Sequence, residues 1–464
     1  MRLSHLLGPE LKQALREDPE QVRALLDEIH PEDLSDLVAE LEPEDAATLM
    51  ARLPAEDAAP IFERLDDHEQ EELVSLMPPE SVAHIASEME ADDRADLFSI
   101  LDEDRGDDIL RRLEQVDPEA ALEVREIEKW PETSAGHLIT TRYVHVAPEA
   151  TVGDAIAAVR ELITEDDEAL YYVYLIGEGD EMVGAVPLRR LLLADDRRMP
   201  LMPLAIGNLI TVPPETDQEE VARQMSKYDL AEIPVIDATG VMLGVITIDD
   251  VVDVLTQEQT EDVQRLGAVE PLDVPYFRTG VFEFVKKRGF WLVVLFFGEF
   301  FTQTALRHYD AVFDALHGAA YYVPLLISAG GNSGSQSSTL IIRGLAVGEV
   351  RMRDWWRVLG RELGMGLILG GILGAIGFVR VMALDPDHSV GFALTIGITL
   401  VGIVVTGCTV GSLLPIALKR IGLDPATSST PFIASLVDVL GIIIFVHVAR
   451  FVLGTMFHQP GLSL

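Results

Sequence analysis

Two carboxylates, Glu299 and Asp438, lie inside stretches that are otherwise apolar enough to cross a membrane. An ionisable side chain at membrane depth costs roughly 2.5 kcal/mol or more, so it usually faces an aqueous path or a partner. No basic residue lies within one helical turn of Asp438. We predict that Asp438 binds a cation, with a buried structural hydrogen bond as the alternative. For Glu299 an ion path and a structural role both stay open, because its depth and facing do not follow from the sequence.

A polar, glycine-rich segment interrupts another apolar stretch. Residues 329–338 read Ala-Gly-Gly-Asn-Ser-Gly-Ser-Gln-Ser-Ser. Hydroxyl and amide groups at membrane depth are tolerated where they meet protein or water rather than lipid. The segment is not a phosphate loop, since no Gly-Lys-Ser/Thr follows it, and this disfavours an ATP-driven pump.

The available ligands favour a hard cation. Carboxylate, amide, hydroxyl and water oxygens suit magnesium, calcium or manganese. The single cysteine, Cys408, excludes an intramolecular disulfide, and the sequence has no Cys/His cluster suited to zinc or copper. Magnesium holds its water tightly, so one or two carboxylates acting on the hydrated ion make a sufficient site. These motifs predict no catalytic residue and no enzyme.

Five apolar stretches position these groups, each long enough to cross a hydrocarbon core about 30 Å thick. They cover residues 289–307, 315–343, 358–384, 391–418 and 431–457. Basic residues, which are enriched in cytoplasmic loops, flank the stretches on one side, whereas the other side carries aspartates such as Asp385 and Asp387. We expect a multi-pass protein of the cell (inner, cytoplasmic) membrane, embedded in the lipid bilayer, with its N-terminus in the cytoplasm. No signal peptide is expected.

Charge divides the chain in two. Its 464 residues hold 35 Lys+Arg and 77 Asp+Glu, a formal net charge of -42, although 48% of them are apolar. Residues 1–280 carry 66 acidic and 22 basic side chains, whereas residues 281–464 carry 11 and 13. A surface as acidic as the first half repels phosphates, so nucleic acid is excluded as a partner.

A repeat of 12 residues occupies residues 31–113. Its units begin at Pro31, Pro43, Ala55, Asp67, Pro79, Ala91 and Glu103, with apolar residues mostly at their seventh, eighth and eleventh positions. Proline or acid at the start suits a helix N-terminus, where proline loses no hydrogen bond and carboxylates meet the positive end of the dipole. Each unit is too short to bury its apolar edge alone, so a stacked coil of short helices is expected.

Two later segments share a layout of short strand, amphipathic helix, two apolar strands and final helix. Residues 151–159 of the first correspond to residues 217–225 of the second, and residues 183–190 to residues 243–250. This arrangement resembles a tandem pair of CBS domains, a module that commonly dimerises and senses adenine nucleotides or ions. The resemblance implies ATP as a candidate ligand.

The whole chain resembles the MgtE family of magnesium channels and transporters. The resemblance rests on the order of the segments, on residues 330–337 followed by Arg343-Gly-Leu-Ala, and on residues 435–439 (Ser-Leu-Val-Asp-Val). The expected fold class is multidomain: an all-α helical-repeat domain (1–130), α+β tandem CBS domains (137–200 and 201–258), a connecting helix (249–285) and a transmembrane domain of five α-helices (286–464). The family implies a homodimer, in which two copies of Asp438 would share an axis.

The resemblance also implies magnesium sites that close the pore when cytosolic Mg²⁺ rises. The acids carried over are Asp92, Asp96, Asp217, Glu219, Asp229, Asp250, Asp253, Glu258, Glu261, Asp262 and Asp424, beside Asp438 in the pore. Unoccupied carboxylates repel one another and a divalent ion would bridge them. Pro60 stands where some members have a carboxylate, which puts that contact in doubt.

The expected function is therefore Mg²⁺ influx regulated by cytosolic Mg²⁺. Two alternatives stay open: a broader divalent transporter for Co²⁺, Ni²⁺ or Mn²⁺, and a membrane-anchored CBS sensor that conducts nothing. The polar groups at membrane depth argue against the sensor, because an anchor needs neither Asp438 nor the polar glycine segment.

Overall fold

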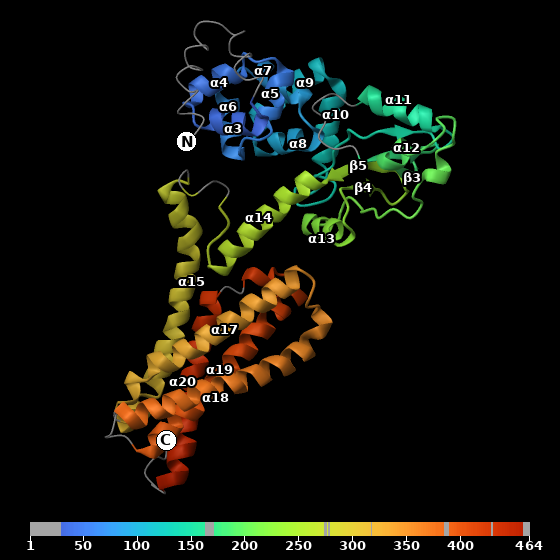
Figure 1. Ribbon diagram of the computed structural model, residues 1–464. Helices are drawn as coiled ribbons and strands as arrows, with labels where there is room; N and C mark the ends of the chain where they lie inside the picture. Colours follow the sequence, from blue (N-terminus) through green and yellow to red (C-terminus); the bar gives the residue numbers. More distant parts are fainter. Residues whose placement is uncertain are drawn as a thin grey trace. The chain divides into compact units, whose positions relative to one another are not determined.

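The computed structural model describes residues 29–162, 171–272, 276, 279–316, 318–384, 389–427 and 430–457. The first 28 residues of the expected helical domain, and the loop with Asp385 and Asp387, lie outside this range. The chain forms two compact units, Met1–Gln257 and Glu258–Leu464 (Figure 1). Each unit is described by itself.

The described part of the first unit begins with eight short helices. They are α3 (Pro31–Ala39), α4 (Pro43–Met50), α5 (Ala55–Phe62), α6 (Asp67–Leu76), α7 (Pro79–Glu88), α8 (Ala91–Ile100), α9 (Glu103–Val116) and α10 (Pro118–Ile127). The helices α3 to α9 begin at the seven residues predicted from the repeat. Proline occupies the first turn of α3, α4, α7 and α10, and Asp66 with Glu69 forms a capping box on α6.

These helices stack in two rows. Helices α3, α5, α7 and α9 follow one another in one row, and α4, α6, α8 and α10 follow one another in the second. The apolar positions of the repeat, such as Leu49, Phe62 and Leu73, form one buried core between the rows. The expected coil of short helices is thus present, and each helix buries its edge against the helix two units away.

The two CBS-like segments follow. In the first, β1 (His145–Val146) pairs in parallel with β2 (Tyr172–Ile176), which pairs antiparallel with β3 (Met182–Pro187). Its helices are α11 (Val152–Leu162) and α12 (Leu188–Leu192). In the second, β4 (Glu232–Ile236) pairs antiparallel with β5 (Met242–Thr247), between α13 (Gln218–Tyr228) and α14 (Ile248–Leu266). Both hairpins shift register at the same place, between Leu175 and Ile176 and between Val235 and Ile236. This shared irregularity supports the duplication inferred from the sequence.

The expected connecting helix is shorter than predicted. Residues 249–285 were expected to form one helix, but α14 ends at Leu266 and the next helix begins at Val281. Gly267 follows α14, and Ala268 has a positive φ of 58°, a conformation that ends a helix.

The second unit contains five long helices. They are α15 (Val281–His308), α17 (Val323–Ala346), α18 (Trp355–Leu384), α19 (Val390–Arg420) and α20 (Thr430–Phe457), with the short α16 (Asp310–Ala315) after α15. Among the described residues, α15, α18, α19 and α20 are long and apolar enough to cross a membrane by length and composition. The fifth, α17, carries the polar glycine segment. The predicted stretch 315–343 began too early, because Gly318 has a positive φ of 84° and separates α16 from α17.

Glycines bring the membrane helices into backbone contact. Helix α19 packs against α17, α18 and α20, and α15 packs against α20 (Figure 1). A Cβ added at Gly407 or Gly411 would meet the carbonyl oxygen of Gly330 or Gly334 on α17. The 407/411 pair thus lets the backbones of α19 and α17 approach closely. At Gly360 and Gly364, by contrast, no atom of the described residues lies within 4 Å of an added Cβ.

Replacing Gly407 with alanine is expected to destabilise the second unit. The added methyl would lie inside van der Waals contact with the Gly330 oxygen, and overpacking of this kind costs about 1–3 kcal/mol. Gly371→Ala is the matched control, since nothing lies within 4 Å of a Cβ there and alanine favours the helix. Thermal unfolding of the purified protein in detergent should give a lower Tm for Gly407→Ala only. Equal Tm values for the two variants would contradict the contact.

Candidate functional site

Asp438 lies on α20, where its side chain is half-buried. The hydroxyl of Ser435, almost one turn earlier on the same helix, donates to Oε1 of Glu299 on α15 at 3.0 Å. Glu299 is also near enough to Asp438 for the two charges to interact. The structure therefore brings together the two intramembrane carboxylates that the sequence singled out, on two helices that pack side by side.

The polar segment of α17 has two faces. Ser333, Ser337 and Ser338 are buried against the other helices. A row of polar side chains on the opposite face is exposed in the single chain: Ser328, Asn332, Gln336 and Thr339. We call these four residues the polar row. The row needs protein or water beside it, because lipid cannot satisfy these groups.

A second group of carboxylates lies in the first unit, where α8 meets the second CBS-like segment. Asp92 on α8 is only 6% exposed, and among the described residues its Oδ1 has no hydrogen-bond partner. Burial raises the pKa of Asp92 well above its usual range, and repulsion from Asp250 raises it further. Burial likewise raises the pKa of Asp250 to about 7. Two of the predicted regulatory acids are thus close together and poorly compensated.

Two further carboxylates join this group. Burial raises the pKa of Asp93 well above its usual range, with added repulsion from Glu63. Burial also raises the pKa of Glu63 to about 7, although its Oε1 accepts a hydrogen bond from the Glu90 N–H at 2.7 Å. We call Glu63, Asp92, Asp93 and Asp250 the buried acid cluster.

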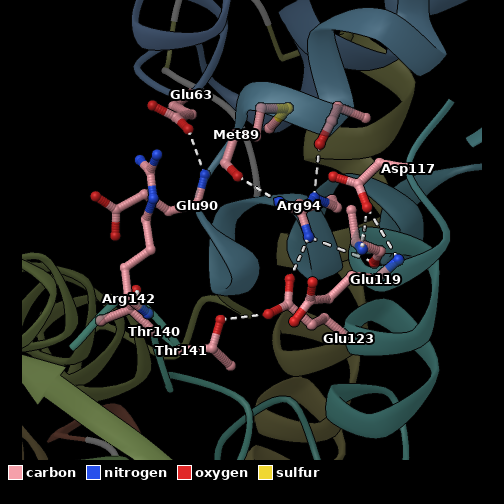
Figure 2. A network of polar contacts seen from close by, with 12 residues as sticks. Glu63, Met89, Glu90, Arg94, Asp117, Glu119, Glu123, Thr140, Thr141 and Arg142 are labelled. Atoms are coloured by element: carbon pink, nitrogen blue, oxygen red, sulfur yellow. Dashed lines mark hydrogen bonds and ion pairs between the residues drawn. The ribbon is translucent and has the colours of Figure 1, made fainter. Parts of the chain in front are cut away.

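Arg94 of α8 lies in a network of polar contacts that ties this helix to its neighbours (Figure 2). Its guanidinium donates to the carbonyl oxygens of Ala86 at 2.6 Å and Met89 at 2.5 Å, and to Oε2 of Glu123 at 2.7 Å. Because these bonds use the charge of Arg94 on other groups, the arginine positions the cluster and does not neutralise it. The apolar side of α8, with Ala91 and Ala95, packs in one core with α13 and the β4–β5 hairpin.

Other predicted ligands are placed separately. Asp96 on α8 bonds Nε2 of His137 at 2.7 Å; burial opposes protonation of this imidazole, but the Asp96 carboxylate raises its pKa. Asp217 caps the start of α13 by accepting the Glu219 N–H at 3.0 Å. Asp229 caps the other end of α13 with a left-handed φ of 52°. Asp217 and Glu219 thus lie a helix length away from Asp229.

On α14, burial raises the pKa of Asp253, with repulsion from Asp249 and Glu32 as smaller causes.

The end of α14 meets the loop between α19 and α20 within the second unit. Burial raises the pKa of Asp262, and repulsion from Asp424 and Glu258 adds to it. Arg265 donates to Oδ2 of Asp424 at 2.8 Å and to Oε2 of Glu261 at 2.7 Å. Glu261 and Asp424 are thus brought together by Arg265, an arginine that the sequence reasoning missed.

No complete metal cage is formed by side chains alone. Among the residues that the structure describes, no group of three or more His, Cys, Asp or Glu side chains could hold a metal ion. Magnesium keeps several waters and needs only one or two carboxylates, so the paired acids fit a hydrated ion. Their roles as ligands stay predictions.

Three family models match the chain, each over a different part. The MgtE model, described as a divalent cation transporter, matches residues 323–448; the MgtE intracellular N domain matches 18–133; and the CBS domain matches 204–257. The magnesium transporter MgtE of Thermus thermophilus is 39% identical over 338 residues, which are 73% of this chain and 74% of that protein. The chain belongs to the MgtE family.

Two further matches agree with this assignment. The magnesium transporter MgtE of Bacillus subtilis is 28% identical over 326 residues, 70% of this chain and 71% of that protein. A crystal structure of the soluble part of a magnesium transporter superposes with a TM-score of 0.51 at 26% identity, covering 55% of this chain and 99% of that one. The predicted MgtE resemblance and multidomain fold class are confirmed, and the chain is a multi-pass membrane protein.

The sequence reasoning missed Glu63 and Arg94, although both differ from the residues that most other repeat units have at the same position. Glu63 is the ninth residue of its unit, a position that holds alanine or serine in five of the other six units. Arg94 is the fourth residue of its unit, where the others have Leu, Ala, Ala, Gln, Val or Gly. Pro60 lies inside α5, three residues before Glu63.

The stability of the first unit is expected to fall as pH rises when no metal is bound. A carboxyl pKa raised by folding gives stability that is fully present below the unfolded-state pKa, 4.5 for Glu63 and 3.8 for Asp250, and is lost as pH rises to about 7. We expect a loss on the order of 1–3 kcal/mol between pH 5 and pH 8. Hydrogen exchange of α8 amides in the intact protein with a chelator present measures this.

In the same experiment, Asp92→Asn should flatten the pH dependence, because one repelling charge is removed. Asp36→Asn, an exposed acid on α3, is the matched control and should keep the wild-type slope. A wild-type protein whose α8 protection rises with pH would contradict the assignment of uncompensated acids.

Proposed function

We propose that this MgtE family member is a homodimeric magnesium channel that admits Mg²⁺ to the cytoplasm. The observation that carries the proposal is the polar row of α17 at membrane depth, beside the helix that bears Asp438. Hydroxyl and amide oxygens can line a path for a hydrated ion, and Asp438 with Glu299 would supply negative charge to attract it. No step makes or breaks a bond in a substrate, so no catalytic residue is proposed.

The same surface supports the proposed homodimer. Within the described residues, a single chain leaves the polar row exposed. A two-fold axis would place the rows and the two Asp438 carboxylates of both copies opposite one another, protected from lipid. We further propose that the N-terminus is cytoplasmic, as the basic loops indicate.

Cytosolic Mg²⁺ is proposed to hold the channel closed. The buried acid cluster and the acids at the end of α14 are costly to ionise, and a divalent ion beside them would relieve the repulsion. Binding would therefore favour the packed arrangement of each group. The CBS pair is proposed to take ATP, on the strength of its duplicated sheet and helix layout.

Asp438→Asn is expected to lower Mg²⁺ uptake at least tenfold, because the neutral amide cannot attract the hydrated dication. Uptake into proteoliposomes at low internal Mg²⁺ measures this, with Asp314→Asn on α16, an exposed acid of the same unit, as the control. Full uptake by Asp438→Asn would sink the pore assignment. A folded wild type that takes up nothing would favour the sensor. Equal competition by Co²⁺, Ni²⁺ or Mn²⁺ would favour the broader transporter.

The double variant Asp92→Asn/Asp250→Asn is expected to need at least threefold more internal Mg²⁺ for half-closure. Two carboxylates that attract the ion are lost, whereas the path in the membrane is unchanged. Graded Mg²⁺ loaded inside proteoliposomes gives the closure curve, and Asp36→Asn should leave it unaltered. A curve for the double variant that overlays the wild type would show that the cluster does not sense Mg²⁺.

A further inference from the structure

A third carboxylate of the second unit was not singled out by the sequence. Glu362 lies on α18, seven residues after its first residue, Trp355, or about 10 Å along the helix axis. Its side chain is only 4% exposed. Its Oε2 accepts a hydrogen bond from the Ser337 hydroxyl of α17 at 2.6 Å. Within the described parts of the chain, no ion pair joins Glu362 to a basic residue.

A carboxylate at this depth is expensive for a role in packing alone. Removing it from water without a basic partner costs several kcal/mol, and an apolar residue of similar size would fill the same space without that cost. Intramembrane acids are therefore functional candidates by default. The partner here is a hydroxyl on the helix that carries the polar row.

Glycines and apolar side chains pack α17 against α19 and α20. Gly330 and Gly334 of α17 meet two glycines of α19 backbone to backbone, because glycines allow close approach. Ile403 of α19 also packs over Gly330, and Ile433 of α20 packs over Gly334. The hydrogen bond accepted by Glu362 adds a directional contact from a further helix, α18.

The bond lies on the face of α17 opposite the polar row. Ser337 is buried on the inner face, beside Cys408 of α19, whereas Asn332 and Gln336 are exposed on the outer face. Because residues three to four positions apart share a helix face, rotation of α17 that breaks the bond also moves the whole row.

We propose that Glu362 is a positioning residue for ion conduction: by accepting the Ser337 hydroxyl it fixes the rotation of α17 and so the placement of the polar row. The inference rests on the proposed channel function for its effect on uptake. The other part of the inference, that the bond fixes the rotation of α17, does not depend on transport.

The test compares variants that remove or keep the bond. Ser337→Ala removes the donor, Glu362→Leu removes the acceptor, and Glu362→Gln keeps an acceptor without charge. Ser333→Ala is the matched control, because that buried hydroxyl bonds the Ala329 carbonyl of its own helix at 2.8 Å. Each substitution is made in the wild-type chain and in a chain that also carries Asn332→Cys. Labelling of the buried Cys408, measured in the chain without Asn332→Cys, is the background.

Two readouts are taken on the intact protein in proteoliposomes. With Ser337→Ala or Glu362→Leu, we expect Mg²⁺ uptake to fall at least fivefold, the Mg²⁺ to Mn²⁺ uptake ratio to change, and maleimide labelling of the Asn332→Cys chain to change at least threefold. Glu362→Gln and Ser333→Ala should stay within twofold of wild type. Combining Ser337→Ala with Glu362→Leu should add nothing to either single change.

Unchanged uptake and labelling in Ser337→Ala, a small substitution expected to fold, would overturn the proposal. Loss of uptake in Glu362→Gln equal to that in Glu362→Leu would also overturn it, since the charge and not the accepted bond would then matter. A wild type that conducts nothing would defeat the channel function, and the labelling would still decide whether Glu362 fixes α17.

Discussion

Both units depend on one constraint. Each holds carboxylates close together without an equal number of cations. In the first unit, Asp92 and Asp250 repel each other where α8 meets the second CBS-like segment. In the second, Asp438 and Glu299 share the contact between α15 and α20. Folding must hold these groups together against repulsion, and it does so with neutral packing and with bonds around them. A small cation that binds there would relieve the repulsion, and this relief would add to its binding free energy.

Arg94 and Arg265 each lie near acidic side chains and differ in what they bind. Arg94 bonds carbonyl oxygens and Glu123, so it orders α8 without bonding the acids beside it. At the edge of the cluster, Nη1 of Arg64 lies 4.0 Å from Oε2 of Glu63. Arg265 bridges Glu261 and Asp424 directly. An outside ion at the end of α14 would therefore compete with an internal cation.

The sequence predicted the repeat well because each unit carries its own signals: an N-terminal proline or acid, then apolar residues at fixed positions. It predicted the end of α14 and the start of α17 poorly, since Ala268 and Gly318 adopt a positive φ, which a hydropathy pattern does not reveal. Asp438 was found because it stands alone among apolar residues. Glu362 was not, because Arg361 precedes it and the pair is typical of a helix end at the membrane surface. Only its burial against Ser337 distinguishes it.

The two-row stack of α3 to α10 has a consequence for how the protein is made. Within each row, every helix touches the helix two units earlier in the chain, so contacts join residues close in sequence. Low contact order of this kind gives fast folding. The acidic stack can therefore complete its core on the nascent chain before α15 emerges from the ribosome. Synthesis would then deliver an already folded, negatively charged domain before the later helices insert.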